Sequence, residues 1–162
     1  MAGVFAEGRG AADDGGPPFL CLFLLRGTLA GDRARVETWV PGETQRIAGD
    51  LAFTPDGAAL TLAADHGGCP MATGGMVGAP YALSRTGGAA PAGWIGVALV
   101  TARRTALRPE PGPAPARAPY LVRFDPVAVL ARRDGWVRAR DLGKTAPVTG
   151  WLPAADLAVV IP

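Results

Sequence analysis

The feature that most restricts the fold of this chain is a succession of short segments in which apolar and polar residues alternate, each ended by a turn signal. Alternation with a period of two places one set of side chains on a single face of a β-strand. It is clearest over 34–40, 46–53 and 58–64. The segment 54–57, Thr-Pro-Asp-Gly, joins the last two and suits a tight turn, because proline presets φ and glycine accepts a positive φ. These segments predict an antiparallel β meander.

Alternation also assigns residues to the interior face of each expected strand. The residues on that face are Val36, Thr38, Val40, Ile47, Gly49, Leu51, Phe53, Leu60 and Leu62. The unbroken apolar run 19–25 is expected to be a buried strand. It is much shorter than the roughly 18 residues that a membrane-spanning helix requires. We therefore expect no transmembrane segment.

Signals for helices are sparse. No segment combines a sustained apolar period of 3.6 residues with capping residues, so helix is expected for one turn at most, near residues 153–156. The glycine-rich stretch 65–80 is expected to be an irregular loop. The 23 glycines and 16 prolines among 162 residues also favour short strands joined by turns. The predicted fold class is all-β: an N-terminal antiparallel meander, small barrel or sandwich, followed by a second β module.

Composition and charge divide the chain into three parts. Residues 1–18 are rich in glycine and alanine without a period and are expected to form a flexible arm. The antiparallel module covers 19–96, and the second module covers 97–162. Residues 1–96 hold six arginines against nine acidic residues, whereas 97–162 hold nine arginines and one lysine against five. The basic part is either a surface for an anionic or acidic partner or an ordinary solvated face. Few aromatic and charged residues argue against nucleic acid as the partner.

The two cysteines, Cys21 and Cys69, do not form a Cys-x-x-Cys motif, which excludes the usual redox and zinc-knuckle patterns. Both adjoin expected strands, so they form either a disulfide, if the compartment is oxidising, or two buried free thiols. The N-terminus lacks the basic region of a secretory signal. The sequence as written therefore indicates the cytoplasm, or the cell envelope if a leader is missing.

Few residues indicate catalysis. Asp65, His66 and Cys69 are close in the sequence, which raises either a metal site or a Cys–His nucleophile. A zinc site needs three or four convergent ligands, and His66 is the only histidine. A polar loop with a structural Cys69 explains the three residues as well. The single serine, Ser84, lacks the Gly-x-Ser-x-Gly environment of a hydrolase nucleophile. We expect no enzyme, no metal and no cofactor.

The C-terminal part carries three phrases: TALRPEP (105–111), FDPVAVLARRDGWVRAR (124–140) and TGWLPAADL (149–157). With its two Gly-Trp pairs, this part resembles the bacterial SH3-like (SH3b) domains. The chain departs from that pattern at Phe124, where the family usually has glycine before Asp125, and in a longer proline-rich loop. The resemblance implies a five-stranded small barrel over 97–162. Its tiny core needs bulky plugs, and the candidates are Val127, Val129, Val137, Leu152 and Leu157.

Domains of this family usually bind peptides or cell-wall stems in a groove between two long loops. The candidate ligand-binding residues are Tyr120, Arg132, Arg133, Trp136, Arg138 and Trp151. The alternative for Trp136 and Trp151 is that both fill the core. The first functional hypothesis is a non-enzymatic protein that binds a protein, a peptide or a cell-wall glycopeptide. The second is a structural accessory subunit of a larger assembly, docking through the arm 1–18 and an exposed 19–25 strand. The third is a small hydrolase that uses Cys69 and His66.

Overall fold

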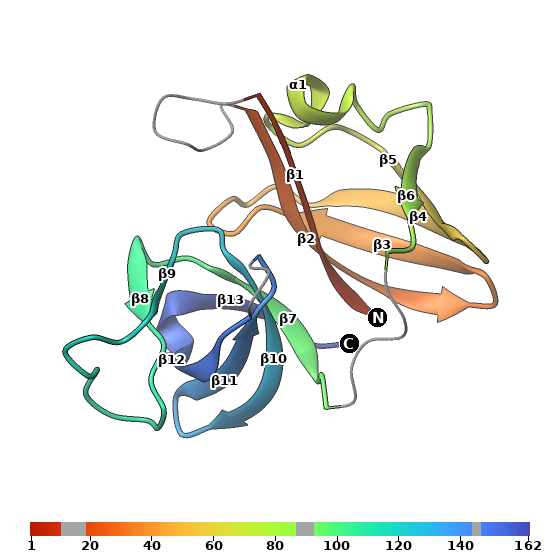
Figure 1. Ribbon diagram of the computed structural model, residues 1–162. Coiled ribbons are helices and arrows are strands. Elements are labelled where there is room, and N and C mark those ends of the chain that lie inside the picture. The colour runs from red at the N-terminus through yellow and green to blue at the C-terminus, as the bar shows by residue number, and fades with distance from the viewer. Residues whose placement is uncertain (11–18, 87–92, 144–146) are drawn as a thin grey trace. The chain divides into compact units, whose positions relative to one another are not determined.

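The computed structural model describes residues 1–10, 19–86, 93–143 and 147–162. The chain forms two compact units, the first within residues 1–89 and the second within 90–162. Both are built from antiparallel strands, which confirms the predicted all-β class (Figure 1). Within the described residues, no helix is long and apolar enough to cross a membrane.

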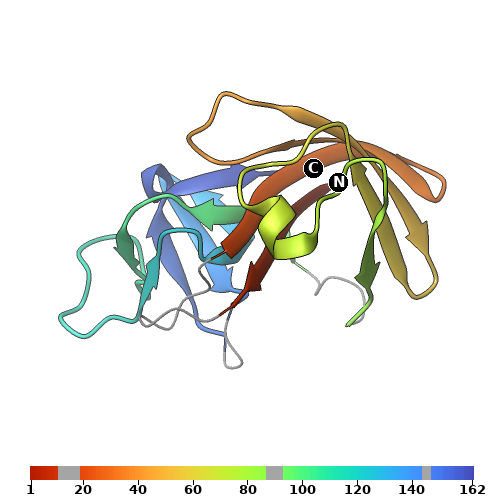
Figure 2. The same cartoon turned by 90° about the horizontal axis from the view of Figure 1, so that it is seen from above.

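The first unit is a six-stranded sheet whose strands are neighbours in chain order, as expected of a meander. Its elements are β1 (Ala2–Arg9), β2 (Phe19–Ala30), β3 (Arg33–Trp39), β4 (Ile47–Thr54), β5 (Gly57–Leu62), α1 (Cys69–Thr73) and β6 (Tyr81–Ser84). The sheet curls, and α1 packs against β2 (Figure 2). One face of the sheet forms the core of this unit.

The interior face is the one predicted by alternation. Buried at this face are Val36, Thr38, Ile47, Leu51, Leu60 and Leu62, with Val40 and Phe53 partly buried against the same core. Gly49 pairs with Val36 on one side and Leu62 on the other. A Cβ at Gly49 would lie 2.7 Å from Leu62 Cδ2, so the absence of a side chain lets these strands pack closely.

The expectation of a flexible arm over 1–18 is wrong for its first part. Ala2–Arg9 forms β1, the edge strand beside β2. Phe5 is buried and stacks on Phe23, with 4.8 Å between ring centroids. The amino group of Met1 donates a hydrogen bond to the Gly27 carbonyl oxygen, which holds the start of the strand. Residues 11–18 lie outside the described part of the chain.

The glycine-rich stretch 65–80 is not wholly irregular, because it contains α1. Gly68 and Gly74 border this helix with φ of 81° and 82°, a conformation that glycine adopts without steric cost. Pro70 occupies the first turn, where its missing N–H has no helical partner to lose. A disulfide between Cys21 on β2 and Cys69 fixes the helix to the sheet.

The second unit is a five-stranded sheet in the order β12-β11-β10-β7-β13, together with a two-stranded ribbon, β8-β9. The bounds are β7 (Gly96–Val100), β8 (Arg104–Ala106), β9 (Tyr120–Val122), β10 (Pro126–Arg133), β11 (Trp136–Asp141), β12 (Thr149–Pro153), η1 (Ala154–Asp156) and β13 (Leu157–Val160). The one helical turn expected near 153–156 is η1. All five candidate core plugs are buried in one cluster.

Candidate functional site

Alternation along β11 and β12 places aromatic and basic side chains together on the face of the second sheet that points away from its core. Trp136 and Arg138 are two residues apart on β11 and therefore project from the same face. Across the sheet, Arg138 pairs with Trp151 on β12, and Trp136 pairs with Arg133 on β10. Register thus brings four of the six candidate residues onto one surface.

Arg108, which sequence reasoning did not single out, joins this surface. Its backbone forms an isolated bridge with Trp151, with hydrogen bonds of 3.0 Å and 2.7 Å in the two directions. Its guanidinium carbon lies 4.6 Å from the Trp136 ring centroid, and that of Arg133 lies 5.5 Å from the Trp151 centroid. We call this surface the arginine–tryptophan face; it consists of Arg108, Arg133, Trp136, Arg138 and Trp151.

Neither tryptophan is a core plug. Both are only partly buried, and neither belongs to the core cluster of the unit or packs against it. The core positions next to them in the sequence are taken by Val137 and Leu152, which are fully buried. Each indole therefore offers part of its apolar ring to a partner while a guanidinium group covers another part.

The arginines of the face are free of carboxylate partners. Within the described residues, the one ion pair joins Arg26 and Glu37 in the first unit. Two carboxylates of the second unit instead bind groups of its own fold. Asp125 accepts from the Val122 N–H at 2.8 Å, and Asp156 accepts from the Thr105 hydroxyl at 2.6 Å. The arginines of the face therefore carry positive charge that no ion pair within the described residues offsets, and such charge attracts anionic groups.

A small hollow adjoins the face at the hairpin between β10 and β11. Its volume is ≈ 220 Å³, and it is lined by Arg132, Arg133, Asp134, Gly135, Trp136 and Ala154. Asp134 and Gly135 both adopt positive φ, 46° and 81°, which is the conformation of a tight two-residue turn. Arg132 is thus placed at the rim of the hollow.

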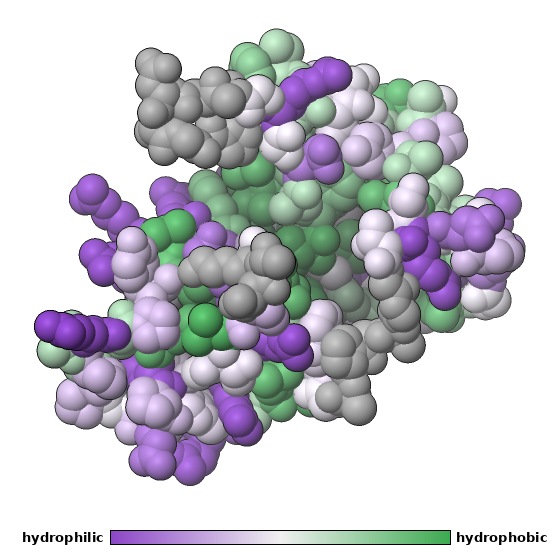
Figure 3. Space-filling model, viewed as in Figure 1, coloured by the Kyte–Doolittle hydropathy of each residue, from purple (hydrophilic) through white to green (hydrophobic). Residues whose placement is uncertain are grey.

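Hydrophilic side chains cover much of the surface of this unit in the view of Figure 3.

Tyr120 lies elsewhere in the unit, on β9. It is 45% exposed, and the Arg104 guanidinium carbon lies 3.6 Å from its ring centroid. A separate shallow depression of ≈ 650 Å³ surrounds it and is lined by Arg117, Ala118, Pro119, Tyr120, Val122 and Asp125. The structure therefore divides the candidate residues between two places.

In the first unit, His66 and Cys69 do not form a nucleophilic dyad, because Cys69 is bonded to Cys21. His66 is buried against Phe23, and its Nε2 lies 2.8 Å from Thr38 Oγ1. The Thr38 hydroxyl donates to the Ile47 carbonyl at 3.0 Å, so it accepts from a protonated Nε2. Burial lowers the pKa of His66, partly opposed by Glu43 and Asp65. The ring is therefore a neutral core group.

No group of three or more potential metal ligands comes together within the part of the chain that the structure describes. The arginine–tryptophan face, which brings four of the six candidate residues together, is the candidate site. Comparisons of this chain with protein-family models, with curated proteins and with solved structures found no match.

Proposed function

We propose that this protein is a non-enzymatic binding protein whose second unit recognises a carboxylate-bearing peptide, free, within a protein, or in a cell-wall glycopeptide. The observation that carries the proposal is the arginine–tryptophan face. Trp136 and Trp151 are partly exposed there, each beside a guanidinium group that has no acidic partner within the described residues.

The chemistry of the face fits such a ligand. An indole ring provides rigid apolar area with little loss of conformational entropy, and arginine binds carboxylates through two parallel hydrogen bonds. Tryptophan and arginine are also the residue types that contribute most binding energy in protein interfaces. Arg138 directly opposite Trp151 allows one ligand to use both kinds of contact at once.

Two observations support the proposal that the second unit is a small barrel of the SH3-like family that it resembles. The strand β13 pairs with β7, and η1 joins β12 to β13, so the sheet order is compatible with a closed five-stranded barrel. Phe124 has φ of 75° at the position where the resembling family usually has glycine. A backbone requirement for positive φ explains why glycine is common there.

The disulfide supports a compartment outside the reducing cytosol, because such bonds persist in secreted and envelope proteins. This location also suits a cell-wall ligand. The accessory-subunit alternative has less support, since Cys21–Leu25 of the 19–25 segment is buried in an interior strand between β1 and β3.

The proposal can be tested by titrating the full-length protein with a hexaglutamate peptide and with a cell-wall glycopeptide that carries free carboxylates. Hexaglutamine serves as the neutral control. We expect binding of at least one acidic ligand, no binding of hexaglutamine, and weaker binding at high salt. Arg138→Gln should weaken binding, whereas Arg117→Gln, at the separate depression, should not. Equal affinities of the two variants, or failure of both acidic ligands at millimolar concentration, would contradict the proposal.

A further inference from the structure

A second surface with unused charges lies on the first unit, on the face of the sheet opposite its core. Alternation along β3 puts Arg33, Arg35, Glu37 and Trp39 on this face. Arg26 on β2 and Arg46, immediately before β4, lie beside it. Arg26 forms the ion pair with Glu37 at 3.0 Å, and Arg46 lies over the Trp39 ring at 4.7 Å. Within the described residues, Arg26 and Arg46 therefore have partners, whereas the other two arginines of this face, Arg33 and Arg35, have none.

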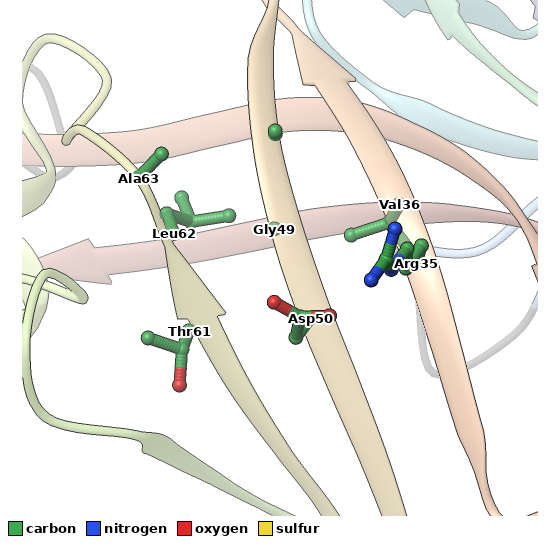
Figure 4. A pocket seen from close by; sticks show the side chains of 8 residues that line it. Arg35, Val36, Gly49, Asp50, Thr61, Leu62 and Ala63 are labelled. Atoms are coloured by element: carbon green, nitrogen blue, oxygen red, sulfur yellow. The ribbon is translucent and has the colours of Figure 1, made fainter.

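Arg35 stands directly opposite Asp50 on β4, and Asp50 stands opposite Thr61 on β5. Figure 4 shows Asp50 between Thr61 and Arg35, with the three side chains on one side of the sheet. Although Arg35 and Asp50 are cross-strand neighbours, they do not form an ion pair. Within the described residues neither side chain makes a hydrogen bond, so Arg35 is available as a donor and Asp50 as an acceptor.

Arg35, Asp50 and Thr61 border a hollow of ≈ 420 Å³, within the size range of small-molecule sites. Its lining also includes Val36, Gly49 and Leu62, the interior-face residues of the same three strands. Ala48 on β4 and Ala63, immediately after β5, are exposed and also line the hollow, so only methyl groups limit the space there. A second hollow of ≈ 250 Å³ lies on the other side of Asp50 and is lined by Arg33, Asp50 and Thr61, with small or apolar neighbours. The two hollows thus share one carboxylate and one hydroxyl, and each has its own arginine.

We infer that these paired hollows bind an acidic oligosaccharide lying along β3. Arg33 and Arg35 are two residues apart, about 7 Å along the strand, so successive acidic groups of one chain can reach both. Asp50 and Thr61 between them need donors as well as acceptors, which sugar hydroxyls provide. A ligand that carries phosphates but few hydroxyls is repelled by the negative charge of the Asp50 carboxylate and offers it few hydrogen-bond donors. A peptide gains little here, because β3, β4 and β5 are interior strands whose backbone groups already pair within the sheet.

The experiment is a titration of the full-length protein with a tetramer of galacturonic acid, a neutral glucose tetramer, polyphosphate and hexaglutamate. We expect the acidic saccharide to bind at least about tenfold more tightly than the glucose tetramer and polyphosphate, the discrimination typical of one charge-assisted hydrogen bond. Any hexaglutamate binding belongs to the arginine–tryptophan face and should be the same in Arg35→Gln as in the wild type. Arg35→Gln and Asp50→Asn should each weaken saccharide binding about tenfold. The matched controls Arg85→Gln and Asp56→Asn, at exposed positions outside both hollows, should bind like the wild type.

Three results would overturn the inference. The first is the absence of saccharide binding at about 10 mM, because a dissociation constant above that concentration is too weak for a functional site. The second is polyphosphate binding that Asp50→Asn strengthens, which would mean a general polyanion surface. The third is hexaglutamate binding that Arg35→Gln abolishes, which would mean a peptide site. The variant Trp151→Ala separates this inference from the proposed function, because it alters the arginine–tryptophan face alone. It should leave saccharide binding unchanged, so a failure of one proposal can be distinguished from a failure of the other.

Discussion

Removal of the Cys21–Cys69 disulfide should destabilise the first unit strongly. The bond joins β2 to a helix of only five residues, and both cysteines are fully buried. Such a short helix is not stable by itself, because few hydrogen bonds repay the entropy of its nucleation. The helix and the loop around it depend on this cross-link and on the packing of Cys69, Ala72 and Met76 into the core.

The magnitude follows from the loop that the bond closes. The cysteines are separated by 48 residues, and the chain-entropy relation gives about 4 kcal/mol of stabilisation for a loop of that length. Domains of this size have free energies of unfolding of about 5–15 kcal/mol. Loss of the bond therefore removes a large part of the stability, and the reduced protein should unfold at a much lower urea concentration.

The assay compares urea unfolding of the oxidised wild type, the reduced wild type, and the Cys21→Ala, Cys69→Ala double variant. The reduced wild type keeps both sulfur atoms, so its difference from the oxidised protein isolates the cross-link. We expect a loss of about 4 kcal/mol on reduction and a larger loss in the double variant, because cavities are added. A loss below about 1 kcal/mol on reduction, or two free thiols in denatured, unreduced protein, would refute the reasoning.

Three further predictions concern named side chains. Trp151→Ala should leave the fold intact and weaken ligand binding by about 2 kcal/mol or more, because the ring lies outside the core. The neighbouring variant Leu152→Ala should instead lower the free energy of unfolding by about 2–5 kcal/mol. Binding calorimetry together with thermal melts separates the two effects. The lowered pKa of His66 means that the unfolded state binds its proton first as the pH falls, so the free energy of unfolding should decrease below about pH 6.5. Denaturation at pH 5 and pH 7.5 checks this, and the decrease should be smaller in His66→Gln. Gly49→Ala should destabilise the first unit, since the added Cβ meets Leu62 and the Thr61 carbonyl oxygen at 2.7 Å; a melting temperature equal to that of the wild type would contradict it.

Local patterning was sufficient to predict β3, β4 and β5 and their interior faces. In β3, β4 and β5 every second residue is apolar or small, and the pleat of a strand turns that period directly into one buried face. The single helical turn at Ala154–Asp156 followed from equally local signals, whereas the core plugs of the second unit were chosen for the barrel that the family resemblance implies.

Properties that depend on which strands become neighbours came only from the tertiary structure. The apolar residues of Ala2–Arg9 are too few to indicate a strand, and β1 exists because β2 offers it an edge and Phe23 offers Phe5 a ring to stack on. Cys21 and Cys69 pair because α1, which carries Cys69, packs against β2, which carries Cys21. Arg108 reached Trp136 through a bridge to β12, and Arg35 met Asp50 through the register of β3 and β4. Strand register is a non-local quantity, set by turns and packing together, so the residues that gather on one face across several strands are decided when the sheet assembles.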